Sequence, residues 1–260
     1  MKKLIFATLF MALVFSGCKN EIPDYDALLI GKWINTQVDG AAVLTDKSYV
    51  CEYRDDLIEF YAIGIQLDEN NKTWTENSNY TYRVEGNLII IDGTDLSDKD
   101  FHMEFEILSI SSGSFTHSVN KFTIDNVEYP DDKIYTLQKV TADYKSQFIG
   151  VWHGRCTTPG SSDTDYHYWE YFADGSFNYY YQDEQENWIR KTDNEGAYFL
   201  YGNLMATNYT NDLILGGVGK AYECWKIRIS GNNMIWTGLR ENNITVTYEM
   251  AKVASAPIVN

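Results

Sequence analysis

Aromatic side chains crowd into residues 166–188, and they are the groups in this chain with the clearest capacity for ligand chemistry. Strand alternation would place Trp169 and Tyr171 on one face, and Tyr179 and Tyr181 on one face of the next strand. Trp and Tyr combine a flat apolar ring with a polar N–H or O–H, so such a wall could stack against a small ligand and orient it. The same residues suit ordinary core packing, so both interpretations stand. The aromatic residues of this span are Tyr166, Tyr168, Trp169, Tyr171, Phe172, Phe177, Tyr179, Tyr180, Tyr181 and Trp188.

Catalytic and metal-binding motifs do not emerge from the remaining polar residues. His102, His117, His153 and His167 stand in no His-x-x-x-His or Cys-x-x-Cys spacing. Nucleophile-elbow, phosphate-loop and dinucleotide fingerprints are absent as well. The acidic stretches 163–165 and 183–186 lack the ligand register of a calcium loop, so solvated loops are the favoured interpretation. We therefore expect a protein that is not an enzyme and that needs neither a cofactor nor a metal.

Composition and charge narrow the possible partners. The chain has 260 residues, of which 44% are hydrophobic and 15% aromatic, which is ample for packed cores. Its formal charge of −16 repels phosphate backbones, so nucleic acid is not an expected partner. Beyond Cys18 the cysteines are Cys51, Cys156 and Cys224. Buried free thiols are favoured, and a Cys156–Cys224 disulfide stays open.

The N-terminus has the layout of an export signal. Lys2 and Lys3 precede an apolar run over 4–15 that is too short for a permanent membrane span, and Ser16-Gly17-Cys18 follows. This segment resembles a bacterial lipoprotein signal, which implies removal of residues 1–17, lipidation of Cys18, and a tether over 18–23. An ordinary secretory signal is the alternative. Loss of the two lysines would take the charge from −16 to −18. We expect an outer membrane lipoprotein held by its lipid anchor only, on either the periplasmic or the cell-surface face.

An internal repeat organises the rest of the chain. Residues 24–33 read DYDALLIGKW and residues 143–152 read DYKSQFIGVW, with a constant offset of 119. Further matches follow in the same order, including 58–64 with 169–175, 82–88 with 198–204, and 135–140 with 248–253. These matches predict one domain over 24–141 and a second over 142–255.

Each copy has the period of β-strands. Asp174-Gly175 is typical of a hairpin turn, and Gly86-Asn87 and Gly202-Asn203 mark the turns of two further strand pairs. Short helices are expected only in the lead-ins at 24–30 and 143–149. Some eight or nine antiparallel strands per copy predict an all-β protein of two small barrels in tandem, because closure removes exposed strand edges. Two sandwiches are the alternative architecture.

A lead-in followed by Gly-x-Trp and about eight short strands resembles the lipocalins, and most closely the lipocalin-like domains of Bacteroidetes lipoproteins. The resemblance implies two lipocalin-like antiparallel β-barrels of the calycin type. It also implies a barrel floor built on Gly31 and Trp33, and on Gly150 and Trp152, with a basic side chain over each Trp. Arg240 is the preferred base for the second copy, since a guanidinium stacks well on an indole. Lys121 is the counterpart of Arg240 in the first copy, and the pair Lys139 and Lys252 is the alternative.

The expected function follows from a difference in aromatic content between the two copies. Where the second copy has Trp169 and Tyr171, the alignment gives Ile58 and Phe60 in the first. We therefore expect the second barrel to bind a small amphipathic or saccharide-like molecule, such as a glycan, and the first to act as a spacer. The alternative is a structural or protein-interaction lipoprotein whose barrels are filled by side chains. The expected ligand-binding residues are drawn from Trp169, Tyr171, Tyr179, Tyr181, Trp188 and Trp225.

Overall fold

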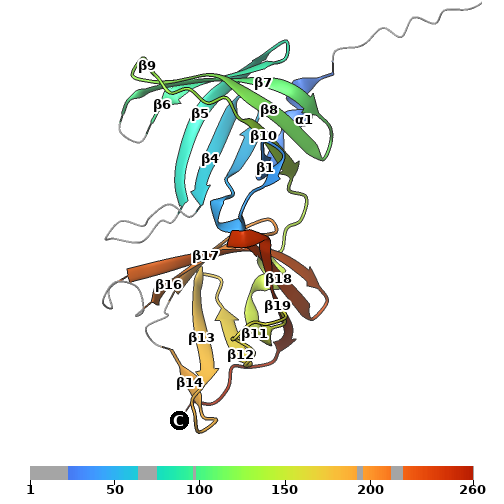
Figure 1. Cartoon of the computed structure of the whole chain (residues 1–260), viewed down its shortest axis with the longest axis vertical. Coiled ribbons are helices and arrows are strands. Elements are labelled where there is room, and N and C mark those ends of the chain that lie inside the picture. Colours follow the sequence, from blue (N-terminus) through green and yellow to red (C-terminus); the bar gives the residue numbers. More distant parts are fainter. Residues whose placement is uncertain (1–22, 64–74, 96–97, 192–195, 212–218, 260) are drawn as a thin grey trace, which may run out of the picture.

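The computed structural model describes residues 23–63, 75–95, 98–191, 196–211 and 219–259. These residues form two β-structures in succession along the chain, blue to green and yellow to red in Figure 1. Cys18 and the rest of the export signal lie outside the described residues, so lipidation stays a prediction. Among the described residues, no helix is long and apolar enough to cross a membrane.

Barrel 1 begins with the short helix α1 (Tyr25–Leu29), whose N-cap is Asp24. A 3₁₀ turn, η1 (Thr45–Lys47), lies between its second and third strands. Its strands are β1 (Gly31–Val38), β2 (Ala41–Ala42), β3 (Val50–Arg54), β4 (Leu57–Ile63), β5 (Thr75–Glu85), β6 (Leu88–Thr94), β7 (Asp100–Ile110), β8 (Ser114–Ile124), β9 (Val127–Glu128) and β10 (Ile134–Lys139). Because β10 pairs with both β8 and β1, eight of these strands close into a ring, and β2 and β9 lie outside it.

Barrel 2 repeats this plan after helix α2 (Lys145–Phe148). Its strands are β11 (Gly150–Cys156), β12 (His167–Tyr171), β13 (Ser176–Gln182), β14 (Trp188–Arg190), β15 (Gly196–Tyr201), β16 (Leu204–Asn211), β17 (Gly219–Ser230), β18 (Asn233–Arg240) and β19 (Ile244–Val253). A 3₁₀ turn, η3 (Glu241–Asn243), joins the last two strands. The pairing of β12 with both β11 and β13 closes eight strands, and β14 lies outside the ring. Two tandem lipocalin-like antiparallel barrels are thus confirmed.

Strand register corrects one part of the repeat alignment. In barrel 1 the motif residue Trp33 pairs with Cys51 of β3, and in barrel 2 Trp152 pairs with Trp169 of β12. The position of Trp169 is therefore held by Cys51 in barrel 1, and not by Ile58 as the alignment implied. The error arose because β3 and β4 are both short apolar strands, so the sequence match slipped by one strand.

The floor of each barrel is built around the motif Trp. The indole Nε1 of Trp33 donates to the Leu29 carbonyl, and that of Trp152 donates to the Phe148 carbonyl, both at 2.7 Å. Both indoles are fully buried, and each ties its lead-in helix to the barrel. Gly31 has φ +120° and Gly150 has φ +122°, a backbone conformation that favours glycine.

The base over each floor is a lysine, and the prediction for Arg240 is wrong. Lys139 Nζ lies 5.1 Å from the ring centre of Trp33, and Lys252 Nζ lies 5.2 Å from that of Trp152. Each lysine is the direct cross-strand partner of its Trp, which explains the pairing. Arg240 pairs instead with Ile244 at the opposite end of barrel 2.

The two barrels share a third apolar cluster besides their own cores. Ile34 and Val50 on the outer wall of barrel 1 pack against Leu204, Ala206 and Cys224 on the outer wall of barrel 2. The Tyr201 hydroxyl donates to the Cys51 carbonyl at 2.8 Å. The barrels are thus joined by a packed interface in addition to the chain connection.

Candidate functional site

A cavity of about 230 Å³ lies inside barrel 2. The strands that supply its wall are β12, β13, β16, β17, β18 and β19, together with the loop before β12 and the residue after β14. Its volume is just below the usual range of roughly 300–1,000 Å³ for small-molecule sites, so it suits a ligand of about one ring. The lining residues are Asp163, Trp169, Tyr171, Phe177, Tyr179, Lys191, Thr207, Glu223, Trp225, Trp236 and Tyr248.

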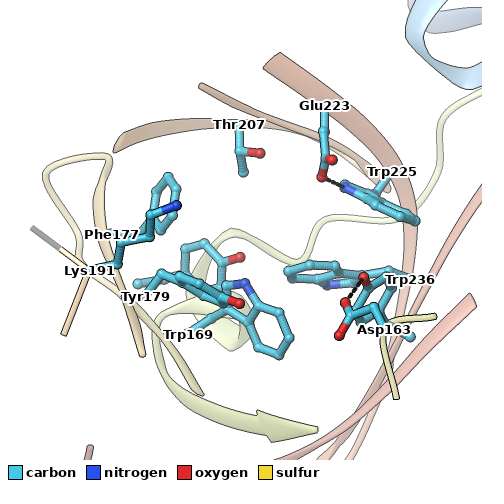
Figure 2. A pocket seen from close by; sticks show the side chains of 11 residues that line it. Asp163, Trp169, Phe177, Tyr179, Lys191, Thr207, Glu223, Trp225 and Trp236 are labelled. Carbon is cyan, nitrogen blue, oxygen red and sulfur yellow. Dashed lines mark hydrogen bonds between the residues drawn. The ribbon is translucent and has the colours of Figure 1, made fainter. Parts of the chain in front are cut away.

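Strand alternation brings the aromatic rings inward. Trp169 pairs with Tyr179 and Tyr171 pairs with Phe177 across β12 and β13, so all four side chains share the inner face. The Trp169 and Trp236 rings meet edge to face, with centroids 5.1 Å apart. Together with their neighbours these rings form one continuous wall (Figure 2).

The cavity gathers four of the six expected ligand-binding residues: Trp169, Tyr171, Tyr179 and Trp225. It does not include Tyr181, which lies beyond Tyr179 on β13 with the two rings stacked 6.3 Å apart. Trp188 is on the outer face of the barrel, where it packs edge to face on Tyr168 at 4.7 Å. The cause is β14, which pairs with β13 outside the closed ring and takes Trp188 away from the interior.

A hydrogen-bonded group at one side of the cavity was not predicted. The Asp163 carboxylate binds the His167 Nε2 at 2.9 Å through one oxygen, and accepts from the Tyr248 hydroxyl at 2.6 Å through the other. The Nδ1 of His167 in turn bonds the Tyr179 hydroxyl at 2.9 Å. The sequence marks Asp163 only as part of an acidic loop. The group ties that loop to β12, β13 and β19.

The other polar groups of the wall come from different strands. Glu223 of β17 accepts from the Trp225 Nε1 at 3.1 Å. Thr207 lies on β16, and Lys191 directly follows β14. Figure 2 shows Asp163 and Glu223 on one side of the cavity and Lys191, beside Phe177, on the other. A molecule in the cavity would therefore meet hydrogen-bond acceptors and a donor on opposite sides.

The tyrosines of the wall are donors at physiological pH. Burial raises the pKa of Tyr171, Tyr179 and Tyr248, and the Asp163 carboxylate raises the last two further. Their hydroxyls therefore keep their protons. Within the described residues, no group of three His, Cys, Asp or Glu side chains is placed to hold a metal ion.

The interior of barrel 1 is different. Its core includes Trp33, Tyr53, Ile58, Tyr82, Phe115 and Leu137, all buried and packed in one cluster. A hollow of about 530 Å³ in this barrel lies between β8 and residues 128–132, and it lacks an aromatic wall of this kind. Cys51, Cys156 and Cys224 are buried free thiols. Cys224 belongs to the interface between the barrels, whereas Cys156 is on β11, so they form no disulfide.

The chain matches no protein-family model and no curated protein. Among solved structures it is similar to the vaccine antigen transferrin binding protein B of Haemophilus parasuis, with 9% sequence identity and a TM-score of 0.23. The alignment covers 82% of this chain and 61% of that one, so the chain spans less than two thirds of that protein's length. A TM-score at this level supports no argument about function.

Proposed function

We propose that the chain is an envelope-anchored lipoprotein whose second barrel binds one small saccharide-like or amphipathic molecule without transforming it. The observation that carries the proposal is the aromatic cavity of barrel 2, with acceptors and a donor on opposite sides. The export signal and Cys18 are the basis for the anchor. Replacing Cys18 with Ala should release the protein from the membrane fraction.

A saccharide ring fits this wall chemically. Its apolar face can stack on Trp169 or Trp236, and its hydroxyls can donate to Asp163 and Glu223 while accepting from Lys191. Hydrogen bonds to charged groups are stronger than neutral ones, so the carboxylates and the lysine would fix the orientation of the ring. The Tyr171 hydroxyl, which is buried without a hydrogen-bond partner and keeps its proton because burial raises its pKa, would add a neutral donor.

The test is calorimetric titration of the full chain with glucose, galactose, mannose and N-acetylglucosamine, and with small aromatic alcohols as amphipathic probes. Trp169→Ala should weaken binding by about fivefold to tenfold, because one stacked ring contributes on the order of 1 kcal/mol. Trp188→Ala is the matched control, since Trp188 lies on the outer face. Thermal unfolding of both variants verifies that each is folded.

Two results would contradict the proposal. One is equal loss of affinity in the Trp169 and Trp188 variants. The other is native mass spectrometry of the protein from its own host that shows no bound molecule, together with no heat of binding for any probe. The second result favours a structural or protein-interaction lipoprotein, an interpretation that the packed cluster of buried side chains described in barrel 1 already suits.

A further inference from the structure

The wall of barrel 2 has a split between β17 and β18. These strands pair from Ser230 and Asn233 as far as Lys226 and Thr237, and no further. Beyond that point β17 stays paired with β16, and β18 stays paired with β19 as far as Arg240. Residues 238–240 therefore have no strand partner in β17.

Barrel 1 occupies this split. Its turn η1 contacts both β17 and β18, and Figure 1 shows the blue end of barrel 1 against the orange and red strands of barrel 2. The Leu239 N–H donates to the Thr45 Oγ1 at 2.8 Å, which satisfies a backbone donor of barrel 2 from barrel 1. Thr45 is only 1% exposed, so this contact is shielded from water.

Arg240, the residue after Leu239, connects the contact with barrel 1 to the cavity wall. Its Nη2 donates to the Cys224 carbonyl at 3.1 Å, which bridges the split from the β18 side. Its guanidinium carbon lies 4.2 Å from the ring centre of Trp225, close enough for a cation–π contact. A Cβ on Gly238 would lie 2.5 Å from Nη1, so the guanidinium rests directly on the backbone of the split segment.

Trp225 is the cavity residue at the end of this path. Its ring is covered by Arg240, and its Nε1 donates to Glu223, the carboxylate that also lines the cavity. Any displacement of β18 at Leu239 therefore moves the side chain that holds Trp225 in place. The path from barrel 1 to the cavity is Thr45, Leu239, Arg240 and Trp225.

We infer that barrel 1 is a working part of the site and not a spacer: η1 sets the position of β18, and Arg240 transmits that position to Trp225 and Glu223. Arg240 is on this view a positioning residue. The inference rests on the proposed function for its effect on ligand affinity, but the structural coupling can be measured without any ligand.

The experiment uses full-length chain labelled with 5-fluorotryptophan, in which the Trp225 fluorine resonance is assigned by its loss in Trp225→Phe. Thr45→Val keeps the volume and removes the hydroxyl, and Arg240→Lys keeps the charge and removes the planar stacking group. Both should shift the Trp225 resonance. Thr116→Val is the matched control, since that hydroxyl bonds Thr136 within barrel 1, and it should leave the resonance unchanged.

The same variants are titrated with whichever of the four monosaccharides binds the wild-type chain most tightly. Thr45→Val and Arg240→Lys should weaken that binding by about fivefold, the lower end of coupling between distant sites. An unchanged Trp225 resonance in Thr45→Val overturns the inference, whatever the affinity of that variant for the sugars. If the resonance moves but neither the four sugars nor the aromatic alcohols bind even the wild-type chain, the coupling stands and the proposed function fails.

Discussion

His117 is a buried histidine in the core of barrel 1. Its ring lies 4.2 Å from that of Phe105 and 5.4 Å from that of Tyr135, and its Nε2 is 3.4 Å from the Tyr49 hydroxyl. Burial lowers the pKa of His117 from 6.5 to about 4. Trp236 holds the equivalent position in barrel 2, since each residue pairs with the corresponding Tyr of the last strand.

The lowered pKa predicts a loss of stability in acid. Between about pH 6.5 and pH 4 the unfolded chain binds a proton at His117 that the folded chain excludes. The free energy of unfolding therefore decreases as the pH is lowered through that window. The loss reaches on the order of 3 kcal/mol below pH 4. His117→Phe should remove this part of the slope, as measured by urea unfolding at several pH values. Parallel curves for the two proteins would show that His117 does not titrate there.

Asp163 should matter for stability as well as for the cavity. Asp163→Ala leaves the His167 Nε2 and the Tyr248 hydroxyl without their partner, and loss of hydrogen bonds to a charged group costs about 1–2 kcal/mol when the group is partly exposed. Asp165→Ala, in the same loop but exposed, is the control and should be neutral. Equal unfolding midpoints for both variants would mean that the group does not hold the loop.

Residues such as Asp163 mark the limit of what the sequence predicts about the site. Alternation alone predicts the inward faces of β12 and β13, so Trp169, Tyr171 and Tyr179 could be identified. Asp163 lies in an irregular loop, where there is no strand alternation to predict which way a side chain points. Trp188 was misplaced for a related reason, because its strand is too short for alternation to show that it leaves the ring.

At the scale of elements, the floors show how a short motif specifies structure. Helices α1 and α2 have five and four residues, too few to be stable alone. The motif Trp holds each one through its indole N–H, and the floor lysine adds a bond to the Gln147 carbonyl in barrel 2 and the Leu28 carbonyl in barrel 1. The Trp could be predicted from its repetition. The lysine could not be chosen over Arg240, since that choice depends on the register of the last strand.

Removing a floor lysine should therefore loosen its helix. Lys252→Met keeps the apolar stem but loses the bond to Gln147 and the cation–π contact with Trp152, at a cost of about 1–2 kcal/mol. Lys121→Met replaces an exposed lysine that lies on β8 of barrel 1 and should change little. Hydrogen exchange of residues 145–149 is the direct measurement. Unchanged protection there in Lys252→Met would rule out the proposed role of the lysine.

At the scale of the molecule, the fold was predictable because the sequence contains two copies of the same strand pattern. The contact between the two copies was not predictable. The interface uses outward residues such as Ile34, Leu204 and Cys224, whose apolar side chains would otherwise face water. In the sequence these outward apolar residues cannot be told apart from the residues that fill the core of a single barrel, because both are apolar residues of strands. The interface also bears on the inference that barrel 1 is more than a spacer, since η1 contacts β17 and β18 in the same packed arrangement.

A pair of turn glycines offers a test of this packing with its own control. Gly86 and Gly202 occupy equivalent hairpins, with φ of +65° and +63°, so alanine costs each a similar backbone strain, about 1 kcal/mol. A Cβ on Gly86 would meet nothing within 4 Å, whereas one on Gly202 would collide with the Val140 side chain and the Ala142 carbonyl.

Those two contacts belong to the segment that joins the barrels, so Gly202→Ala must displace the connection as well as strain the turn. We expect Gly86→Ala to lower the melting temperature slightly while the chain still unfolds in one transition. Gly202→Ala should lower it more, split the calorimetric transition into two, and expose the connection at residues 140–143 to limited proteolysis. If both variants melt alike and resist the protease alike, the barrels do not depend on each other for their stability.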